Sequence, residues 1–456
     1  MARWTLGLMV SLSGCSLLVP GNDGLTPDLV DGGQVDRDAG RDAGRDTGVE
    51  PGTDAGPACE SGLTECGGDC VDTQTDLAHC GGCDSACAAT DLCREGACFD
   101  PVVEVAAGTN HTCAVQASGA VWCWGKNETG QLGTGDFADS SVPRRVVDID
   151  DAIGVTAAGR IFGGFPGVTC VHRSSGQAWC WGFNDSSQLG DATSDVRNRP
   201  VRAGSLEGVL RTETGLSGSC ALRTADPNLL CWGGLRTDGT PRTVPEGILG
   251  LPLPPTRVVD LDMSNGHVCA VDDDEQLWCW GINDSGQLGD GTTTSRAAVA
   301  RVVPDLTDVV EVATGLVSTC ARQSSGQVWC WGMAQMLGVG MTGTDPVTSP
   351  QRVTSVSNAI RLHADQTTMC AIRVDGSVWC WGRDILESER TGTEVMLPEP
   401  VELVGLHGSE SLAGGFRHLC ALTMDGEVVC LGDNGVGQLG DGTMEDRFEP
   451  AAVALP

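Results

Sequence analysis

The chain has 456 residues and a formal net charge of −33, from 28 Lys and Arg against 61 Asp and Glu. This length allows one large domain with smaller accessory segments. The acidic balance argues against a nucleic-acid-binding protein, which needs clustered basic groups to neutralise phosphates, and the 23 cysteines indicate an oxidising compartment.

Residues 1–15 have the features of an export signal. They contain Arg3, an apolar run over residues 6–12 and the sequence Leu12-Ser13-Gly14-Cys15. The run is too short to span a bilayer. Its last four residues resemble the lipobox of bacterial lipoproteins, which implies that Cys15 becomes an acylated N-terminus and attaches the chain to a membrane through that lipid only. An ordinary signal peptide with an unrelated cysteine is the alternative.

Residues 16–58 are rich in Asp, Gly and Pro and contain no aromatic residue. Because this composition offers little apolar surface to bury, we predict a disordered tether. Calcium binding by the Asp-Gly repeats is an alternative, although neither the EF-hand loop nor the glycine-rich nonapeptide is present.

Residues 59–98 hold a dense group of cysteines: Cys59, Cys66, Cys70, Cys80, Cys83, Cys87, Cys93 and Cys98. Such density in an exported segment predicts a small disulfide scaffold, and eight cysteines leave 105 connectivities open. The segment resembles the cysteine-rich motif of the stigma-specific protein family. Zinc binding by Cys80 and Cys83 with the neighbouring His79 is the alternative.

From residue 99 onward one unit occurs seven times, and its first cysteine marks each copy. The markers are Cys113, Cys170, Cys220, Cys269, Cys320, Cys370 and Cys420. They are separated by 57, 50, 49, 51, 50 and 50 residues. A period of about 50 residues made of short strands indicates a propeller or a solenoid.

A second cysteine follows each marker after ten residues, or after eleven in the third copy. If Cys113 faces Cys123 across a β-hairpin, the loop is residues 117–119, and Gly119 supplies the left-handed conformation that ends such a turn. Directly opposed cysteines lie about 4.5 Å apart at Cα, within the range that a disulfide accepts. We therefore predict seven cross-strand disulfides: Cys113–Cys123, Cys170–Cys180, Cys220–Cys231, Cys269–Cys279, Cys320–Cys330, Cys370–Cys380 and Cys420–Cys430.

Two further motifs recur. An aromatic-x-Trp-Gly strand contains Trp122 and Trp124 in the first copy, and a Gly-Gln-Leu-Gly turn stands at residues 130–133, 286–289 and 437–440. Together with a Gly-x-x-His segment before the hairpin, these motifs resemble the regulator of chromosome condensation repeat family over residues 102–456. The resemblance implies a β-propeller, and some members of that family promote nucleotide exchange on a small GTPase. Eleven of the twelve tryptophans lie in the Trp-Gly strand, so we predict that they form the core between blades.

The order of strands predicts how the ring closes. Each copy contains a proline-flanked Val strand, as at residues 143–147, and then a second strand, as at residues 310–315. The first copy starts with the second type at residues 102–108, whereas residues 450–456 match the first type and precede no hairpin. Pairing this C-terminal strand into the first blade would close the ring. We predict an all-β, seven-bladed β-propeller over residues 99–456, closed by the C-terminal strand.

A catalytic or metal site requires groups that converge on one point. His111, His267 and His418 each lie two residues before a hairpin cysteine, which distributes them around the ring, so we interpret them as structural. The sequence contains no nucleophile elbow, phosphate-binding loop or His-Glu-x-x-His motif. We therefore predict no catalytic residue, no cofactor and no metal.

The repeat pattern fails in the third copy, where an irregular segment replaces the Gly-Gln-Leu-Gly turn. Four aliphatic residues in that segment form a candidate partner patch: Ile248, Leu249, Leu251 and Leu253. The alternative is that they fold beneath the blade.

The sequence favours an exported bacterial protein of the cell envelope, anchored by lipid at the outer membrane or cell surface. We expect a monomeric, non-catalytic module that binds an extracytoplasmic protein or glycan and no nucleic acid. Two alternatives are nucleotide exchange, which the family resemblance implies, and inhibition of an extracellular hydrolase.

Overall fold

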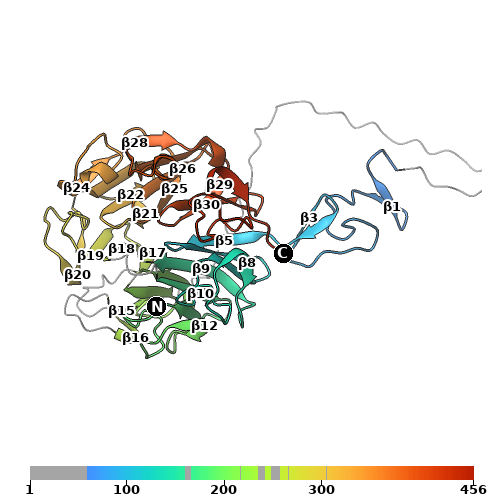
Figure 1. The fold of residues 1–456 in the computed structure, drawn as a ribbon, viewed down its shortest axis with the longest axis horizontal. Helices are drawn as coiled ribbons and strands as arrows, with labels where there is room; N and C mark the ends of the chain where they lie inside the picture. Colours follow the sequence, from blue (N-terminus) through green and yellow to red (C-terminus); the bar gives the residue numbers. More distant parts are fainter. Residues whose placement is uncertain are drawn as a thin grey trace, which may run out of the picture. The chain divides into compact units, whose positions relative to one another are not determined.

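The computed structural model describes residues 59–159, 166–215, 217–234, 242–247, 257–264, 266–304 and 306–456 (Figure 1). The predicted signal peptide with Cys15 and the predicted tether lie outside the described residues. No helix within these ranges is both long enough and apolar enough to cross a membrane.

The cysteine-rich segment folds into two short hairpins held by disulfides. Its strands are β1 (Thr64–Cys66), β2 (Asp69–Val71), β3 (Leu92–Arg94) and β4 (Ala97–Phe99). The disulfides join Cys59 to Cys70, Cys66 to Cys83, Cys80 to Cys93 and Cys87 to Cys98. Because Cys80 and Cys83 belong to two different disulfides, neither offers the thiolate that zinc binds, and the zinc alternative loses its ligands.

The remaining strands form seven four-stranded antiparallel sheets, each built from strands that are consecutive in the chain. The first blade has β5 (Val102–Ala107), β6 (His111–Gln116), β7 (Val121–Gly125) and β8 (Ser140–Arg145), and the second has β9 (Ala152–Gly159), β10 (Gly167–Arg173), β11 (Ala178–Gly182) and β12 (Arg197–Arg202). The third has β13 (Val209–Thr214), β14 (Gly218–Arg223), β15 (Leu229–Gly233) and β16 (Arg242–Gly247), and the fourth has β17 (Val258–Met263), β18 (His267–Asp272), β19 (Leu277–Gly281) and β20 (Arg296–Val302).

The last three blades carry the short helices of the described chain. The fifth blade has β21 (Val309–Thr314), β22 (Ser318–Gln323), β23 (Val328–Met333), η1 (Ala334–Met336) and β24 (Pro346–Arg352). The sixth has β25 (Ala359–Ala364), β26 (Thr368–Arg373), β27 (Val378–Arg383), α1 (Ile385–Thr391) and β28 (Met396–Glu402). After η2 (Val404–Leu406), the seventh has β29 (Ser409–Gly414), β30 (His418–Thr423), β31 (Val428–Gly432) and β32 (Arg447–Ala452).

The blades are arranged around a common axis, with the first strand of each blade innermost and the fourth outermost (Figure 1). The hairpin tips between second and third strands lie beside the start of the innermost strands, because Val102 pairs with Gln116. We call this end of the propeller the hairpin face. The opposite end, which carries the turns after the innermost strands and the loops after the third strands, is the turn face.

The hairpins have the geometry that the cysteine spacing predicts. In every blade the two cysteines are directly paired and disulfide-bonded, with Cα–Cα distances of 4.0 to 4.2 Å. Gly119 at the first tip has a φ of +88°. The fourth blade has Glu275 at the equivalent position, and its φ of +61° shows that the turn imposes the left-handed conformation even on a residue with a side chain.

The seven-bladed propeller is confirmed, but the predicted pairing of the C-terminal strand is wrong. Strand β32 pairs with β31 of its own blade, and the first blade already has its outermost strand in β8. The fourth strand of each blade follows the third strand of the same repeat, so each blade is built from four consecutive strands and no strand is exchanged between the first and seventh blades.

The blades are joined instead by a repeated contact of the Trp-Gly strand. The indole Nε1 of Trp124, Trp181, Trp232 and Trp331 donates to the carbonyl of Gln438, Gln131, Gln188 and Gln287, at 2.8 to 2.9 Å. Each acceptor lies in the glutamine turn of the preceding blade. The glycine that ends the turn packs directly on the same indole, as Gly440 does on Trp124. The seventh blade therefore contacts the first through the same joint that links other neighbours, and this contact closes the ring.

The three histidines strengthen these joints. His111, His267 and His418 each hydrogen-bond through Nε2 to a threonine of the next blade, at 2.8 to 3.0 Å. Each threonine hydroxyl donates to the glutamine carbonyl, so the imidazole is the donor in the shared bond. Burial lowers the pKa of all three to about 3, which keeps them neutral. These three histidines therefore stabilise three separate contacts between neighbouring blades.

Candidate functional site

The seven innermost strands enclose an axial channel with a volume of about 270 Å³. All seven strands line it, and the residues fall into levels along the axis because the blades repeat in register. The middle level contains the residues opposite the first cysteine of each hairpin: Ala106, Thr156, Glu213, Asp262, Ala313, His363 and Ala413. The level two residues earlier, nearer the hairpin face, contains Glu104, Gly154, Arg211, Asp260, Glu311, Arg361 and Ser411.

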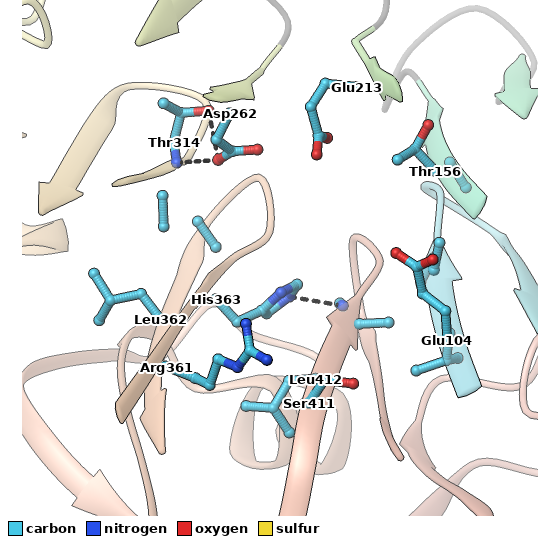
Figure 2. A pocket seen from close by; sticks show the side chains of 18 of the residues that line it. Glu104, Thr156, Glu213, Asp262, Thr314, Arg361, Leu362, His363, Ser411 and Leu412 are labelled. Atoms are coloured by element: carbon cyan, nitrogen blue, oxygen red, sulfur yellow. Dashed lines mark hydrogen bonds between the residues drawn. The ribbon is translucent and has the colours of Figure 1, made fainter. Parts of the chain in front are cut away.

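Carboxylates dominate the charge of these two levels. Five acidic residues line the channel against two arginines: Glu104, Glu213, Asp260, Asp262 and Glu311, with Arg211 and Arg361. Figure 2 shows the carboxylates of Glu104, Glu213 and Asp262 turned toward one shared space from three different blades.

Several of these side chains stabilise the inner edge of the next blade. An innermost strand has free backbone N–H groups along the channel, since nothing pairs with its inner edge. Asp260 Oδ2 accepts from the N–H of Val312 at 2.9 Å, and Glu104 Oε2 accepts from that of Val155 at 3.1 Å. His363 Nε2 accepts from the N–H of a seventh-blade glycine at 2.7 Å (Figure 2). Part of the channel's polarity is therefore structural.

An ion-pair chain crosses from the third blade to the fourth. Arg211 Nε lies 2.7 Å from Glu213, and its Nη1 lies 2.6 Å from Asp260. Glu311 pairs at 2.6 Å with Arg322. Each guanidinium neutralises part of the negative charge, and the carboxyls still outnumber the guanidiniums.

Burial makes ionisation of the channel carboxyls unfavourable. It raises the pKa of Glu104 to about 7 and that of Asp262 to about 6. Burial also raises the pKa of Glu213 to about 8, against the opposing effect of the Arg211 charge. Burial lowers the pKa of His363 to about 4, so its imidazole is neutral. The channel thus holds several acidic groups that a positive charge inside it would stabilise in the ionised form.

At the turn face the channel narrows to a cavity of about 80 Å³ lined by Asp365 and Gln366. Gln366 reaches across the axis, and its Nε2 donates to Thr109 Oγ1 at 2.8 Å and to the Gly159 carbonyl at 3.1 Å. Asp365 is 6% exposed, and its Oδ1 accepts two backbone N–H groups while its Oδ2 has no hydrogen-bond partner. This end therefore combines a bridging side chain with an unsatisfied buried carboxylate oxygen.

The hairpin face has a different character, since an aliphatic ring surrounds the mouth of the channel. In every blade a β-bulge inserts one extra residue at the second position of the innermost strand. A bulge re-aims the side chain that it carries. Five of these extra residues are branched aliphatic side chains exposed by 47 to 55%: Val103, Ile153, Leu210, Val259 and Ile360. We call these five the aliphatic ring. Each directly precedes a residue of the level nearer the hairpin face, which places the ring at the channel mouth.

Sequence reasoning missed the channel and its ring. Their members are single residues about 50 positions apart, and each one is unremarkable in its own segment. The available signal was the alignment of the seven strands before the hairpins, where acids stand at positions that hold Ala, Gly or Thr in other copies. The predicted patch of Ile248, Leu249, Leu251 and Leu253 lies outside the described residues.

The described chain contains two sets of three potential metal-ligating side chains that lie within 4.8 Å of one another. One consists of the disulfide-bonded Cys80, Cys87 and Cys98, and the other of Glu389, Asp433 and Asp446. Neither set lies in the channel, whose described carboxyls are therefore spread along the axis rather than gathered around one point.

These features define a seven-bladed propeller with repeats of one known type. The Regulator of chromosome condensation (RCC1) repeat matches residues 102–131, 258–287 and 410–438, and a second model of this repeat matches residues 118–161. The Stigma-specific STIG1-like protein family matches residues 49–100. Both predicted resemblances are confirmed.

Two curated relatives illustrate the range of proteins that contain similar repeats. The human E3 ubiquitin-protein ligase HERC2 is 32% identical over 206 residues, which is 42% of this chain and 4% of HERC2. The Ultraviolet-B receptor UVR8 of Arabidopsis thaliana is 29% identical over 253 residues, which is 52% of this chain and 55% of UVR8. The chain thus spans little more than half of one relative and a small part of the other.

Among solved structures, Prp20p from Saccharomyces cerevisiae has a similar fold, with a TM-score of 0.62. The two chains are 19% identical, and the likeness covers 78% of this chain and 86% of Prp20p. Prp20p itself binds Gsp1p and histones. At this identity the likeness shows the shared propeller fold alone.

Proposed function

We propose that this protein is an exported, lipid-anchored binding module without catalytic activity, which engages a protein partner at the hairpin face of its propeller. The aliphatic ring is the observation that carries the proposal. Large aliphatic side chains that are half exposed and gathered at one mouth are typical of protein interaction sites, because contact with a partner removes them from water.

A protein partner fits the ring better than a glycan. Sugar rings are bound mainly by stacking on exposed aromatic faces and by polar groups. The five residues of the ring are aliphatic, and Glu410 takes the same position in the seventh blade. The first tryptophan of the Trp-Gly strand is half-buried in the blades that have one, and the second is fully buried. The described hairpin face therefore favours apolar contact with another polypeptide.

Export and lipid attachment remain part of the proposal. All 22 cysteines of the described chain form disulfides, as expected for a protein that folds in an oxidising compartment. The 23rd cysteine is Cys15, the residue that the lipobox resemblance assigns to acylation. Beyond the shared fold, no observation favours nucleotide exchange or hydrolase inhibition.

A capture experiment with matched surface variants tests the proposed face. The purified protein is immobilised and incubated with envelope and culture fractions of its own cells, and bound proteins are identified by mass spectrometry. The ring variant is Ile153→Asp with Leu210→Asp, and the control is Phe137→Asp, at a 50% exposed residue in the loop after β7 on the turn face.

We expect a partner that the wild type and the control retain and the ring variant loses. Thermal unfolding of all three proteins verifies that the variants are folded. Equal capture by the ring variant and the wild type would contradict the proposal, as would loss of capture in the control alone.

A further inference from the structure

The axial channel has features that a structural role alone does not require. Backbone capping explains one oxygen of Glu104, Asp260 and Asp262. It does not explain Asp365, which places a partnerless Oδ2 in the narrow end of the channel while being 6% exposed. A buried carboxylate oxygen without a donor is costly, and a cation in the same cavity would supply one.

Gly414 holds the channel open beside this oxygen. A Cβ atom on Gly414 would lie 2.9 Å from Asp365 Oδ2 and 2.8 Å from His363 Nε2. His363 Nε2 already accepts from the N–H of Gly414, so Asp365 Oδ2 is the atom here that lacks a donor. The donor that fits this place must be small.

The acidic groups form a column. Starting from the hairpin face, the first level contains Glu104, Asp260 and Glu311, the second Glu213 and Asp262, and the third Asp365. Each level lies two positions further along the innermost strands than the one before it. Two residues of a β-strand span about 6.6 Å. Two amines joined by four methylenes lie about 6 Å apart in an extended chain, by standard bond lengths. The spacing of the levels thus resembles the spacing of charges in a short alkyl diamine.

Apolar side chains form a smaller part of the wall between the acids. Val105, Ala157, Leu362, Leu412 and Ala413 contribute to the channel wall. Methylene groups of a linear ligand can pack on these side chains while its ammonium groups meet the carboxylates. A volume of about 270 Å³ corresponds to about nine waters at about 30 Å³ each, which is enough for a short linear amine.

The spread of the carboxyls distinguishes this ligand from a divalent metal ion. Calcium collects six to eight oxygens at about 2.3–2.6 Å. In the described residues no three channel carboxyls bring ligand atoms within 4.8 Å of one another. Six carboxyls of the channel and its narrow end outnumber the guanidiniums of Arg211, Arg361 and Arg322. Carboxyl groups are therefore available along the axis to ionise beside a bound cation.

We propose that the axial channel binds a linear primary alkylammonium group, presented either by a free polyamine or by a lysine side chain of the protein partner. Access is from the hairpin face, because Gln366 bridges the axis at the turn face. The entering group passes the aliphatic ring, and the lysine form of the proposal rests on the proposed function. Asp262 and Glu213 contact the first ammonium group, and Asp365 contacts a second one in a ligand long enough to reach it.

Isothermal titration calorimetry on the whole purified protein tests the channel directly. Spermidine, 1,4-diaminobutane, a lysine-containing tetrapeptide and calcium chloride are titrated in parallel at fixed ionic strength. The channel variants are Asp262→Asn and Asp365→Asn, which keep the shape of the side chain and an oxygen that can accept the backbone bonds. The control is Asp150→Asn, at a carboxylate with an 81% exposed side chain outside the channel.

We expect one saturable site for spermidine or for the lysine peptide, weakened about tenfold or more by Asp262→Asn and unchanged by the control. If Asp365→Asn weakens the binding of spermidine but not that of the lysine peptide, the free polyamine is the better fit. If Asp365→Asn weakens the binding of neither ligand while Asp262→Asn abolishes binding, the ligand is the lysine side chain. Amine binding that is equal in all variants, or absent, overturns the proposal, as does calcium binding that Asp262→Asn abolishes. The capture assay with the ring variant tests the proposed function separately. If the ring variant loses the partner but the channel binds no amine, only the channel proposal is refuted.

Discussion

The contact between the seventh and first blades yields a prediction with a magnitude. Gly440 has a φ of +71°, and a Cβ atom there would lie 2.7 Å from Trp124 Nε1 and 2.8 Å from its Cδ1. Gly440→Ala therefore places a side chain in the left-handed region, at a cost of about 1–2 kcal/mol. It also overpacks a fully buried indole, at about 1–3 kcal/mol. The variant is expected to lose about 2–5 kcal/mol of unfolding free energy.

Two further variants separate the conformational cost from the cost of overpacking the indole. Gly133→Ala makes the same change at the joint between the first and second blades, where a Cβ atom would lie 2.7 Å from Trp181 Nε1, so it is expected to cost a similar amount. Gly442→Ala has a φ of +82° but meets nothing closer than 3.7 Å, so only the conformational cost of about 1–2 kcal/mol applies. Urea unfolding with the disulfides intact, followed by tryptophan fluorescence, ranks the three. If Gly440→Ala is no worse than Gly442→Ala, the ring is not closed by this joint.

Three other predictions concern the disulfides, the channel and the anchor. Replacing Cys420 and Cys430 together by Ala is expected to cost up to about 3 kcal/mol, by the entropy of the released loop, and urea unfolding at equal protein concentration measures it; a stability equal to wild type would contradict the reasoning. Burial raises the pKa of Asp365 to about 7 from an unfolded value of 3.8, so its contribution to stability is full below about pH 3.8 and is lost as the pH rises through about 7. The wild type should therefore lose up to about 4 kcal/mol more unfolding free energy than Asp365→Asn between about pH 4 and about pH 8. Thermal unfolding of both proteins across this range measures the difference, and an equal loss of stability in the two proteins would refute the reasoning. Cys15→Ser should release the protein from the membrane fraction and abolish labelling by palmitate, whereas unchanged fractionation would remove the lipid anchor from the account.

The blade architecture was predictable because each repeat contains the residues that determine the fold of its own blade. A cysteine pair ten residues apart fixes a hairpin register, as at Cys113 and Cys123, and a repeated register fixes the blade. The buried tryptophans and the structural histidines follow from the same repetition. Such features are local in sequence and recur at the same position of the repeat, so comparing the copies is sufficient to predict them.

Ring closure and the channel were not predictable in the same way. A repeating chain can be divided at several points, and the proline-flanked strand can belong to the blade before it or after it; the register of β32 on β31 decides this. The channel depends on residues such as Glu104, Glu213 and Asp262, which come together only when the ring exists. The connectivity of the cysteine-rich segment is likewise a property of the folded chain.

The role of the hairpin face is tested most directly by site-specific photo-crosslinking in the cells that produce the protein. A photoreactive amino acid is placed at Ile153 of the aliphatic ring and, separately, at Phe137 on the turn face, two positions of similar exposure at 53% and 50%. We predict a discrete protein adduct from position 153 that position 137 does not give. An adduct from position 137 alone, or the same adduct from both positions, would contradict binding at the channel mouth.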